Sequence, residues 1–334
     1  MPKLEEIEPE ILPSKDTLSI VAVGDIMIGS AFPSEEFLPK DDGLNSFDAV
    51  KEYLKGDIVF GNLEGVFLDY GNSEKCKGKE PHRCYAFRMP ERYAQIIKEA
   101  GFNVMSVANN HSMDFGEKGK KRTVEILEEL NIHFAGYQEK PFEIFEKEGI
   151  KYAFCAFAPN LGMQSLLRIS EAENIVRQLK NEVDIVIVSF HGGAEGTKHT
   201  RVPKKEEFFY GENRGDVYLF AHKMIDSGAD IVLGHGPHIT RAVEVYQGKF
   251  IAYSLGNFNT YGRFNLDKEN GIAPLLDIQL DQNGNFIKAK VVSIKQIRNK
   301  GMFIDDEEKA FAELKRLSDL DFPNHSLIFE NGEI

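Results

Sequence analysis

Tryptophan is absent from this 334-residue sequence, cysteine occurs only three times, and no run of about 18 uninterrupted apolar residues is present. So few cysteines exclude a disulfide scaffold, and without such a run we expect no membrane span. The first residues, MPKLEEIEPEILPSKD, are acidic and contain three prolines, whereas a secretory signal begins with basic residues followed by an apolar stretch. We therefore expect a cytoplasmic protein; a mature extracytoplasmic form that has lost its leader is the alternative.

Positive charge is also scarce, because 53 Asp and Glu residues oppose 40 Lys and Arg residues and give a formal net charge of −13. Proteins that bind nucleic acid hold phosphates with an excess of Lys and Arg, so we expect no nucleic-acid partner. The same deficit disfavours attachment to anionic lipid. A bound cation, in contrast, would be stabilised in such a field.

The three cysteines differ in their sequence context. Cys155 lies in the apolar run YAFCAFA, which is typical of a buried thiol. Cys76 and Cys84 flank the polar segment KGKEPHR, and they could form a disulfide or remain free thiols. Only His82 accompanies this pair, so a metal site there is the weaker interpretation.

The hydrophobic pattern predicts an α/β (α+β) fold, because short β-branched runs alternate with segments of helical period. We expect two sheets packed face to face with helices outside, in one domain over 1–334 with an N-terminal extension at 1–17 and a C-terminal helical tail at about 300–334. The region from 240 to 294 has tight turns and predicts a mostly antiparallel second part. The predicted strands are 18–24, 57–61, 103–108, 151–158, 184–190, 230–234, 250–256, 274–280 and 286–294, and the predicted helices are centred on 93–100, 217–225 and 306–318.

Polar side chains follow the predicted strands at the points where the strands end. In an open α/β sheet the carboxyl ends of the strands share one edge, and ligands bind there. Any one of these residues alone would be interpreted as a turn former or a core histidine, but their repetition at six strand ends favours one shared site. The residues concerned are Asp25, Asn62, Glu64, Asn109, Asn110, His111, Asp114, His191, His235, His238 and Asn257.

The residue types at this edge favour a metal centre. Carboxylates and imidazoles crowded at a partly buried edge are costly unless a cation compensates them. A mixed oxygen and nitrogen donor set suits Mn, Fe or Zn, whereas Ca and Mg prefer oxygen alone. The candidate ligands exceed what one catalytic ion needs, so we expect two divalent ions bridged by Glu64. Sequence motifs of P-loops, nucleophile elbows, HExxH zinc sites and dinucleotide folds are absent.

Six motifs then carry a resemblance to a known family. They occur in the order seen in CapA-type poly-γ-glutamate capsule synthesis proteins, and together they cover about residues 18–280. This family looks like a branch of the calcineurin-like metallophosphoesterases, which implies a four-layer αββα sandwich of two mixed sheets and a two-metal centre. The motifs are GDIMIG (24–29), GNLEG (61–65), ANNHSMDFG (108–116), SFHGG (189–193), GADIVLGHGPH (228–238) and AYSLGNF (252–258).

The resemblance also implies a role for individual residues. His111, oriented by Asp114, would be the catalytic group that protonates a leaving oxygen. The implied ligands are Asp25 and His238 for the first metal, Asn110, His191 and His235 for the second, and Glu64 as the bridge.

Two positions depart from the family pattern. Met27 stands where the superfamily has a histidine, so the first metal loses a ligand and is expected to be weak and exchangeable. Gly236 replaces the middle residue of a Gly-His-His-Pro-His motif, which changes the shape of the loop more than the number of ligands.

The segment 195–217 is unusually basic for an acidic chain, with His199, Lys204 and Lys205 among its residues. One interpretation is a solvated loop held by ion pairs to its own glutamates. The other is an anion clamp beside the metals, since arginine binds planar carboxylates and phosphates with two parallel hydrogen bonds. The predicted substrate-binding residues are Arg201, Arg214, Arg241, Asn62 and Asn257.

Two hypotheses of function follow. The first is a metal-dependent hydrolase that acts on a phosphoester or a polyanionic substrate within capsule biosynthesis. The second, favoured by Met27, is a subunit of the capsule-synthesis machinery that binds polyglutamate without catalysis. A binding protein without metal is a weaker third hypothesis.

Overall fold

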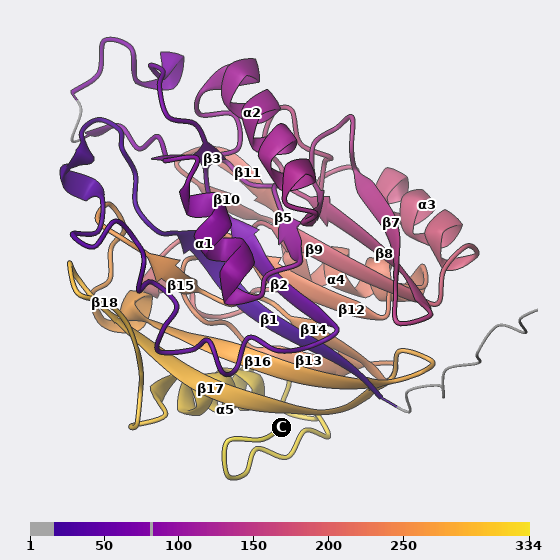
Figure 1. The fold of residues 1–334 in the computed structure, drawn as a ribbon. Helices are drawn as coiled ribbons and strands as arrows, with labels where there is room; N and C mark the ends of the chain where they lie inside the picture. The colour runs from indigo at the N-terminus through magenta and orange to yellow at the C-terminus, as the bar shows by residue number, and fades with distance from the viewer. Residues whose placement is uncertain (1–16, 81–82) are drawn as a thin grey trace, which may run out of the picture.

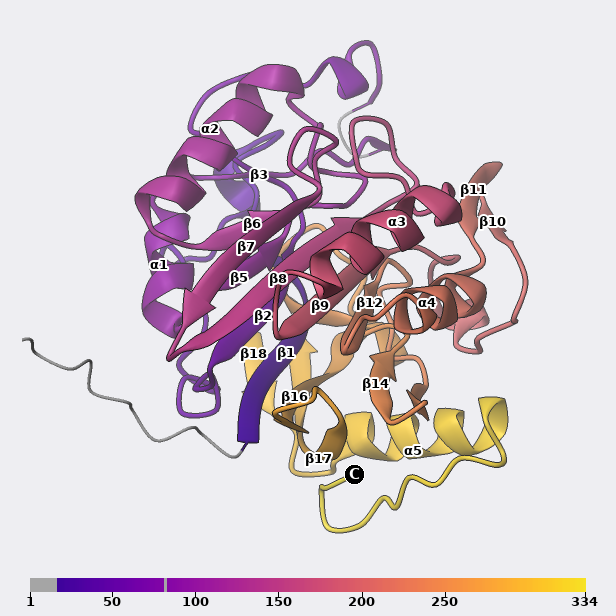
Figure 2. The same cartoon turned by 90° about the vertical axis from the view of Figure 1, so that its right-hand side faces the viewer.

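The computed structural model describes residues 17–80 and 83–334, so the predicted extension at 1–17 lies outside it except for its last residue, and so does His82. Two mixed β-sheets form the centre of the fold, and their strands run side by side in Figures 1 and 2. Among the described residues, none of the helices combines the length and the hydrophobicity that crossing a membrane requires.

The larger sheet contains the first strand of the described chain near its middle. β1 is parallel to β2 and to β15, and antiparallel to β16. The order across the sheet is β18 (Gly301–Ile304), β17 (Phe286–Ile297), β16 (Ile272–Asp281), β1 (Thr17–Met27), β2 (Ile58–Leu63), β5 (Val104–Ser106) and β6 (His133–Ala135), with β15 (Asn257–Thr260) paired to β1.

The smaller sheet packs against the larger one. The ring of Phe60 on β2 lies 5.6 Å from that of Phe154 on β8, which marks the apolar layer between the two sheets. The order across this sheet is β13 (Val243–Tyr246), β14 (Lys249–Ala252), β12 (Ile231–His235), β9 (Ile185–His191), β8 (Ile150–Phe157) and β7 (Phe142–Lys147). Two short pairs lie apart, β3 (Val66–Phe67) with β4 (Arg88–Met89), and β10 (Glu207–Phe209) with β11 (Glu212–Gly215).

Helices cover the outer faces of both sheets. α1 (Tyr93–Ala100) and α2 (Gly116–Glu129) pack on the larger sheet, and α3 (Ile169–Lys180) and α4 (Val217–Asp226) pack on the smaller one (Figures 1 and 2). Val176 and Phe220 belong to the same apolar cluster as Cys155 and Val188 of the smaller sheet. The predicted αββα sandwich of two mixed sheets is therefore confirmed.

The C-terminal part differs from the prediction. β18 adds a strand to the larger sheet before α5 (Lys309–Asp321) begins, and Glu333 then forms a bridge to Lys290 of β17. The region is therefore not only helical. Strands β14 and β15 are parallel to their neighbours β12 and β1, so the second part is less antiparallel than its tight turns indicate.

The predicted strand 250–256 is in fact two strands in different sheets. β14 ends at Ala252, and the chain then crosses to the larger sheet, where Asn257 begins β15 beside Asp25. Gly256 has a φ of +66°, and a Cβ on Gly24 would lie 1.9 Å from the carbonyl oxygen of Gly256. The two glycines thus let the crossing segment lie against β1.

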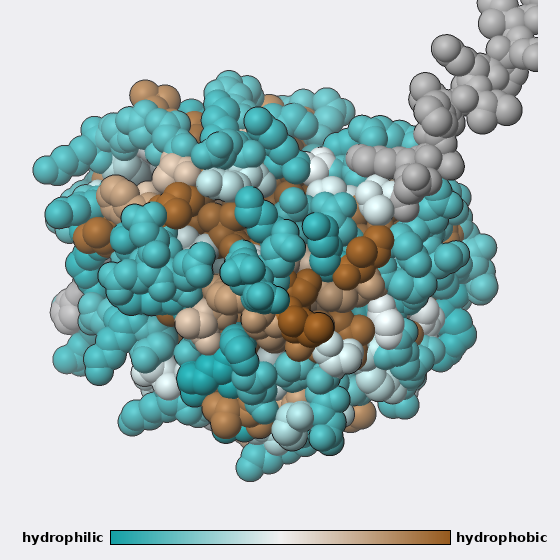
Figure 3. Space-filling view, turned by 90° about the horizontal axis from the view of Figure 1, so that it is seen from below, coloured by the Kyte–Doolittle hydropathy of each residue, from teal (hydrophilic) through white to brown (hydrophobic). Residues whose placement is uncertain are grey.

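The surface seen from below is mostly hydrophilic, with a limited group of hydrophobic residues near its middle (Figure 3). Some apolar surface of this kind is ordinary on a protein whose surface is otherwise polar.

Candidate metal centre

Asp25 lies on β1 where the two sheets meet. It is aligned with Asn62 on β2 and with Asn257 on β15, and its side chain is fully buried. One carboxylate oxygen accepts a hydrogen bond from Asn62 Nδ2 at 2.8 Å, and the other lies 2.8 Å from His238 Nδ1. His235 Nδ1 lies 3.4 Å from the first oxygen. Burial opposes ionisation, but these two histidines outweigh it and hold the pKa of Asp25 well below its usual range.

Glu64 follows β2 directly and is also fully buried. Its Oε2 accepts a hydrogen bond from Asn62, whereas Oε1 has no hydrogen-bond partner within the described chain. This orphaned oxygen lies 3.5 Å from His191 Nε2 and 4.0 Å from His111 Nε2. Burial, together with the negative charge of Asp25, raises the pKa of Glu64 to about 7.

The smaller sheet supplies the histidines. His191 ends β9 and His235 ends β12, and the two are paired in register. His238 follows in the next loop with a φ of +57°, a backbone conformation that is strained for a residue with a side chain. Although burial disfavours its charge, the hydrogen bond to Asp25 raises the pKa of His238 to about 10. Glu64, His191 and His238 each offer a ligand atom, and these atoms lie within 4.8 Å of one another.

These residues fit a divalent cation, as their unpartnered atoms indicate. A buried polar group without a partner costs about 1–3 kcal/mol, so several in one place need an explanation. A cation bound by lone pairs would satisfy them together and would replace the positive charge that His238 carries. The buried atoms that have no hydrogen-bond partner within 17–80 and 83–334 include Glu64 Oε1, Asn110 Oδ1 and both ring nitrogens of His191 and of His235.

One ring nitrogen of His111 contacts Asp114, and the other faces the candidate metal centre. Its Nδ1 lies 2.6 Å from Asp114 Oδ2, and the ring of Phe87 lies against it at 4.1 Å. Its Nε2 is the nitrogen that points toward Glu64. Burial opposes ionisation of Asp114, but the charges of His111 and Lys75 outweigh it and lower the pKa of Asp114. Lys75 donates a hydrogen bond to Asp114 Oδ1, and sequence reasoning missed this lysine because it lies in a single 3-10 turn, η2 (Glu74–Cys76), that no apolar pattern marks.

Asn62 has a different role from the one predicted. Its amide donates hydrogen bonds to both Asp25 and Glu64, and its oxygen accepts one from Asn109 Nδ2 at 3.1 Å. Because Asn62 is fully buried and its polar atoms are all engaged, it holds the two carboxylates in place and has no group left for a substrate.

The three predicted arginines lie in different places, and of these three Arg214 lines the cavity beside the candidate metal centre. Its side chain is only 2% exposed, and Nη1 donates to Glu195 Oε1 at 3.0 Å. Its Nε and Nη2 have no hydrogen-bond partner within the described residues. Arg214 lies on β11, within the hairpin into which the segment 195–217 folds.

Arg241 and Arg201 do not reach the cavity. Arg241 is fully buried and forms two hydrogen bonds to Glu207, at 2.9 and 2.8 Å. Arg201 pairs with Asp321 at the end of α5. Both arginines therefore anchor the loop, and their interpretation as substrate-binding residues is corrected. The charge pattern could not distinguish the two roles, because the acidic partner of Arg201 lies 120 positions away.

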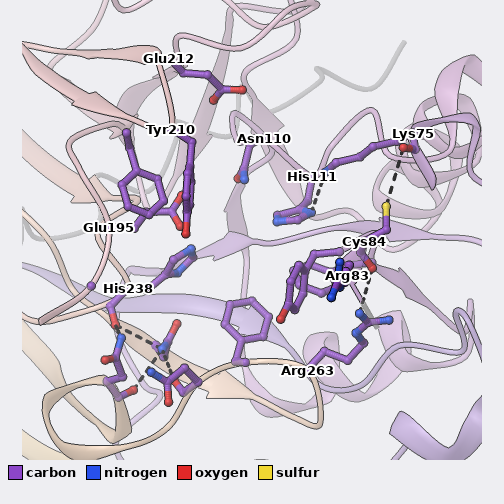
Figure 4. A pocket seen from close by; sticks show the side chains of 18 of the residues that line it. Lys75, Arg83, Cys84, Asn110, His111, Glu195, Tyr210, Glu212, His238 and Arg263 are labelled. Carbon is purple, nitrogen blue, oxygen red and sulfur yellow. Dashed lines mark hydrogen bonds between the residues drawn. The ribbon is translucent and has the colours of Figure 1, made fainter. Parts of the chain in front are cut away.

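The cavity beside these groups has a volume of about 590 Å³. Asn110, His111 and His238 border it together, as Figure 4 shows. Asn257 also lines the cavity. Its Nδ2 donates a hydrogen bond to the backbone carbonyl oxygen of Asn270 at 3.0 Å. A disulfide joins Cys76 and Cys84 at the edge of the cavity, which settles the pairing that the sequence left open.

The two departures from the family pattern also have a structural setting. Met27 is fully buried in the main apolar cluster. Gly236 has a φ of +115°, and a Cβ there would lie 2.7 Å from the carbonyl oxygen of Gly192. Glycine is therefore required by the close approach of the two histidine-bearing loops.

Comparisons with known proteins agree with the motifs. The chain is 29% identical over 278 residues to the capsule biosynthesis protein CapA of Bacillus anthracis, a match that covers 77% of this chain and 63% of the relative. It is 29% identical over 266 residues to the PGA biosynthesis protein CapA of Bacillus subtilis (strain 168), covering 73% of this chain and 64% of the relative. The chain thus spans less than two thirds of the length of these relatives.

Among solved structures, a putative 5'-nucleotidase from Staphylococcus aureus, in complex with alpha-ketoglutarate, aligns with 91% of this chain and 58% of its own, at 13% identity and a TM-score of 0.46. The sequence of residues 19–261 matches the family described as bacterial capsule synthesis protein PGA_cap. This match covers well over half of the chain, which therefore belongs to that family.

Proposed function

We propose that this protein is a metal-dependent hydrolase that acts on a phosphoester or a related polyanionic substrate in the biosynthesis of a capsule polymer. The observation that carries the proposal is the cluster of buried ligand atoms on Glu64, His191 and His235 that have no hydrogen-bond partner among the described residues. Family membership and the CapA relatives support a place in capsule or poly-γ-glutamate biosynthesis.

The residues that would hold divalent ions come from both sheets. We propose two ions of Mn, Fe or Zn, with Glu64 between them and the first held more weakly because Met27 offers no imidazole. Such ions would supply Lewis acidity and activate a water molecule. The proposed ligands are Asp25, Glu64, Asn110, His191, His235 and His238.

Other side chains around this centre would deliver a proton, orient the residue that delivers it, and bind the substrate. His111 would hold a proton at Nε2, the nitrogen that faces Glu64, and deliver it to the leaving oxygen. Asp114 would fix the orientation of that ring through Nδ1. Arg214 would donate its unpartnered Nε and Nη2 to an anionic group of the substrate in the cavity.

The proposal is tested by elemental analysis of the purified protein and by hydrolysis of p-nitrophenyl phosphate and bis-p-nitrophenyl phosphate with added Mn, Fe or Zn. We expect Glu64→Gln and His235→Ala to lower metal affinity and turnover by more than about tenfold. Glu139→Gln is the matched control, because Glu139 lies on the surface with 71% of its side chain exposed. Unchanged metal content and activity in Glu64→Gln would contradict the proposal.

A second candidate is a subunit that binds polyglutamate without hydrolysing it. Met27 favours it, because the loss of one ligand weakens the metal on which turnover would depend. Binding of glutamate oligomers by the metal-loaded protein, with no turnover on esters or amides, would select this candidate.

A further inference from the structure

Cys76 and Cys84 are joined at the ends of a segment, here called the disulfide loop, of which Lys79, Arg83 and Cys84 line the cavity that His111 also borders. Its two cysteines are buried, and they pack with Val66, Ala86 and Phe115 in a small apolar cluster of their own. The Cα atoms of the cysteines are 5.6 Å apart. The two ends of the loop are thus anchored, and its residues Lys79 and Arg83 line the cavity.

Other contacts fix the loop relative to the catalytic group. Lys75, directly before the loop, bonds to Asp114, the partner of His111. At the other end, Arg263 donates a hydrogen bond to the carbonyl oxygen of Cys84 at 2.9 Å. The start of the loop is therefore tied to Asp114, the residue that orients His111.

The side chains that this region presents to the cavity are cationic. Lys75, Lys79, Arg83 and Arg263 all line it, and Figure 4 shows Lys75, Arg83 and Arg263 on the same side of the cavity. Within 17–80 and 83–334, neither Lys79 nor Arg83 has a recorded side-chain hydrogen bond or ion pair, and both are exposed. Such a cationic wall is an exception in a chain with a net charge of −13.

The opposite wall differs in charge. Glu195 and Glu212 line it, and both lie near the guanidinium of Arg214, at 3.0 and 4.0 Å respectively. An anion that enters the cavity would therefore be drawn toward the disulfide loop, because Lys79 and Arg83 have no acidic partner among the described residues.

We propose that Lys79 and Arg83 of the disulfide loop form an outer anion-binding subsite. The ligand then extends from the metal centre to the loop and carries at least two negative groups, carboxylates or phosphates. This inference rests on the proposed function for the location of the inner group. A cavity of about 590 Å³ is large enough for such a ligand.

The test is a comparison of long and short anions by isothermal titration calorimetry of the full chain loaded with Mn²⁺. The long probes are tetra-γ-glutamate and inorganic tripolyphosphate, and the short probes are glutamate and inorganic phosphate. In the double variant Lys79→Gln/Arg83→Gln we expect the affinity for a long probe to fall about tenfold, with the short probes changed less than about twofold. Binding of the long probe should also become less sensitive to salt, because two ionic contacts are lost.

The matched control is Lys51→Gln/Lys55→Gln, which removes the same charge at two exposed lysines that do not line the cavity. A loss confined to one of the two long probes supports the subsite and identifies its ligand as carboxylate or phosphate. Equal affinity of the double variant and the unaltered protein for both long probes overturns the inference, as does failure of the unaltered protein to bind either. The titration measures binding and not turnover, so its result does not depend on hydrolysis. Binding here, together with no hydrolysis in the p-nitrophenyl phosphate assay, would refute the hydrolase and leave the subsite in place.

Discussion

His111 has two ring nitrogens with different surroundings. Nδ1 is engaged by Asp114, which also accepts hydrogen bonds from Lys75 and from the backbone N–H of Phe87. Nε2 faces Glu64 at 4.0 Å. The hydrogen bond between Nδ1 and the carboxylate fixes the orientation of the ring, with Nε2 directed at the reacting group. Asp114 therefore acts as a positioning residue.

Replacement of this carboxylate should affect some substrates more than others. In Asp114→Asn we expect kcat for an alkyl phosphoester, whose leaving oxygen needs a proton, to fall on the order of 10²-fold with little change in KM. The fall for a p-nitrophenyl ester, which leaves without protonation, should be much smaller. Steady-state kinetics on both substrates checks this. An equal loss on both would indicate structural damage instead of a lost proton donor.

Residues at strand ends, or within a few positions after them, could be predicted from the sequence, whereas Lys75, far from any strand end, could not. Asp25, Glu64, His191 and His235 converge because buried strands deliver them to one edge, and the strands are visible as apolar runs. Lys75 lies in a segment without periodicity, so no pattern places it beside Asp114. Arginine roles depend on partners that are distant in sequence, as the pairing of Arg201 shows.

At the level of elements, Glu143 links the edges of the two sheets. It lies on β7, and its carboxylate contacts His133 Nδ1 at 2.7 Å and accepts the backbone N–H of Phe134 at 3.1 Å, both on β6. Lys140 Nζ is 2.9 Å away. Burial opposes ionisation, but these contacts outweigh it and lower the pKa of Glu143 to about 2.

This link should make stability depend on pH. Because the pKa of Glu143 is lower in the folded chain than the ordinary 4.5, the ionised carboxylate stabilises the fold above about pH 4.5 and loses its effect as the pH falls toward 2. In Glu143→Gln we expect the free energy of unfolding to fall by about 1–2 kcal/mol at pH 7, allowing for solvent screening, and by progressively less below pH 4.5. Urea denaturation across this range measures it.

The control for that substitution is Glu146→Gln on the same strand, where the side chain is exposed. A deficit of Glu143→Gln that stayed constant from pH 7 to acid would show that the charge of Glu143 is not its cause.

A regular apolar stripe made some helices predictable, although α3 was missed despite burying Ala172, Val176 and Leu179 at helical spacing. α1 and α4 have regular apolar spacing, and the structure contains both. α2 was not predicted, because its buried face includes Gly119 and Thr123 and its sequence contains the basic run KGKKR. The crossing after Ala252 was missed as well, since the apolar run continues through it and only the pairing partner changes.

For the whole molecule, the proposed metal ligands lie on both sides of the interface between the sheets. Asp25 and Glu64 belong to the larger sheet or follow it, and His191 and His235 end strands of the smaller one. An ion bound by both groups would therefore tie the two sheets together. Ligands that bind only the folded state stabilise it by mass action.

We expect Mn²⁺ at about 100 times its dissociation constant to raise the free energy of unfolding by about 2.7 kcal/mol, and Tm by several degrees. Differential scanning calorimetry with Mn²⁺ or with EDTA measures this difference. Glu139→Gln should keep the shift and Glu64→Gln should lose most of it. A Tm that is the same with Mn²⁺ and with EDTA would refute the idea that the ion joins the sheets.

The bond between Cys76 and Cys84 has a consequence for where the protein works. Such bonds persist in the periplasm, at the cell surface and in secreted proteins, whereas glutathione and thioredoxin reduce them in the cytosol. A cytosolic copy would thus lose the covalent tie that keeps its cationic wall against the cavity. Of the two compartments considered from the sequence, the bond therefore favours the extracytoplasmic alternative over the cytoplasmic expectation.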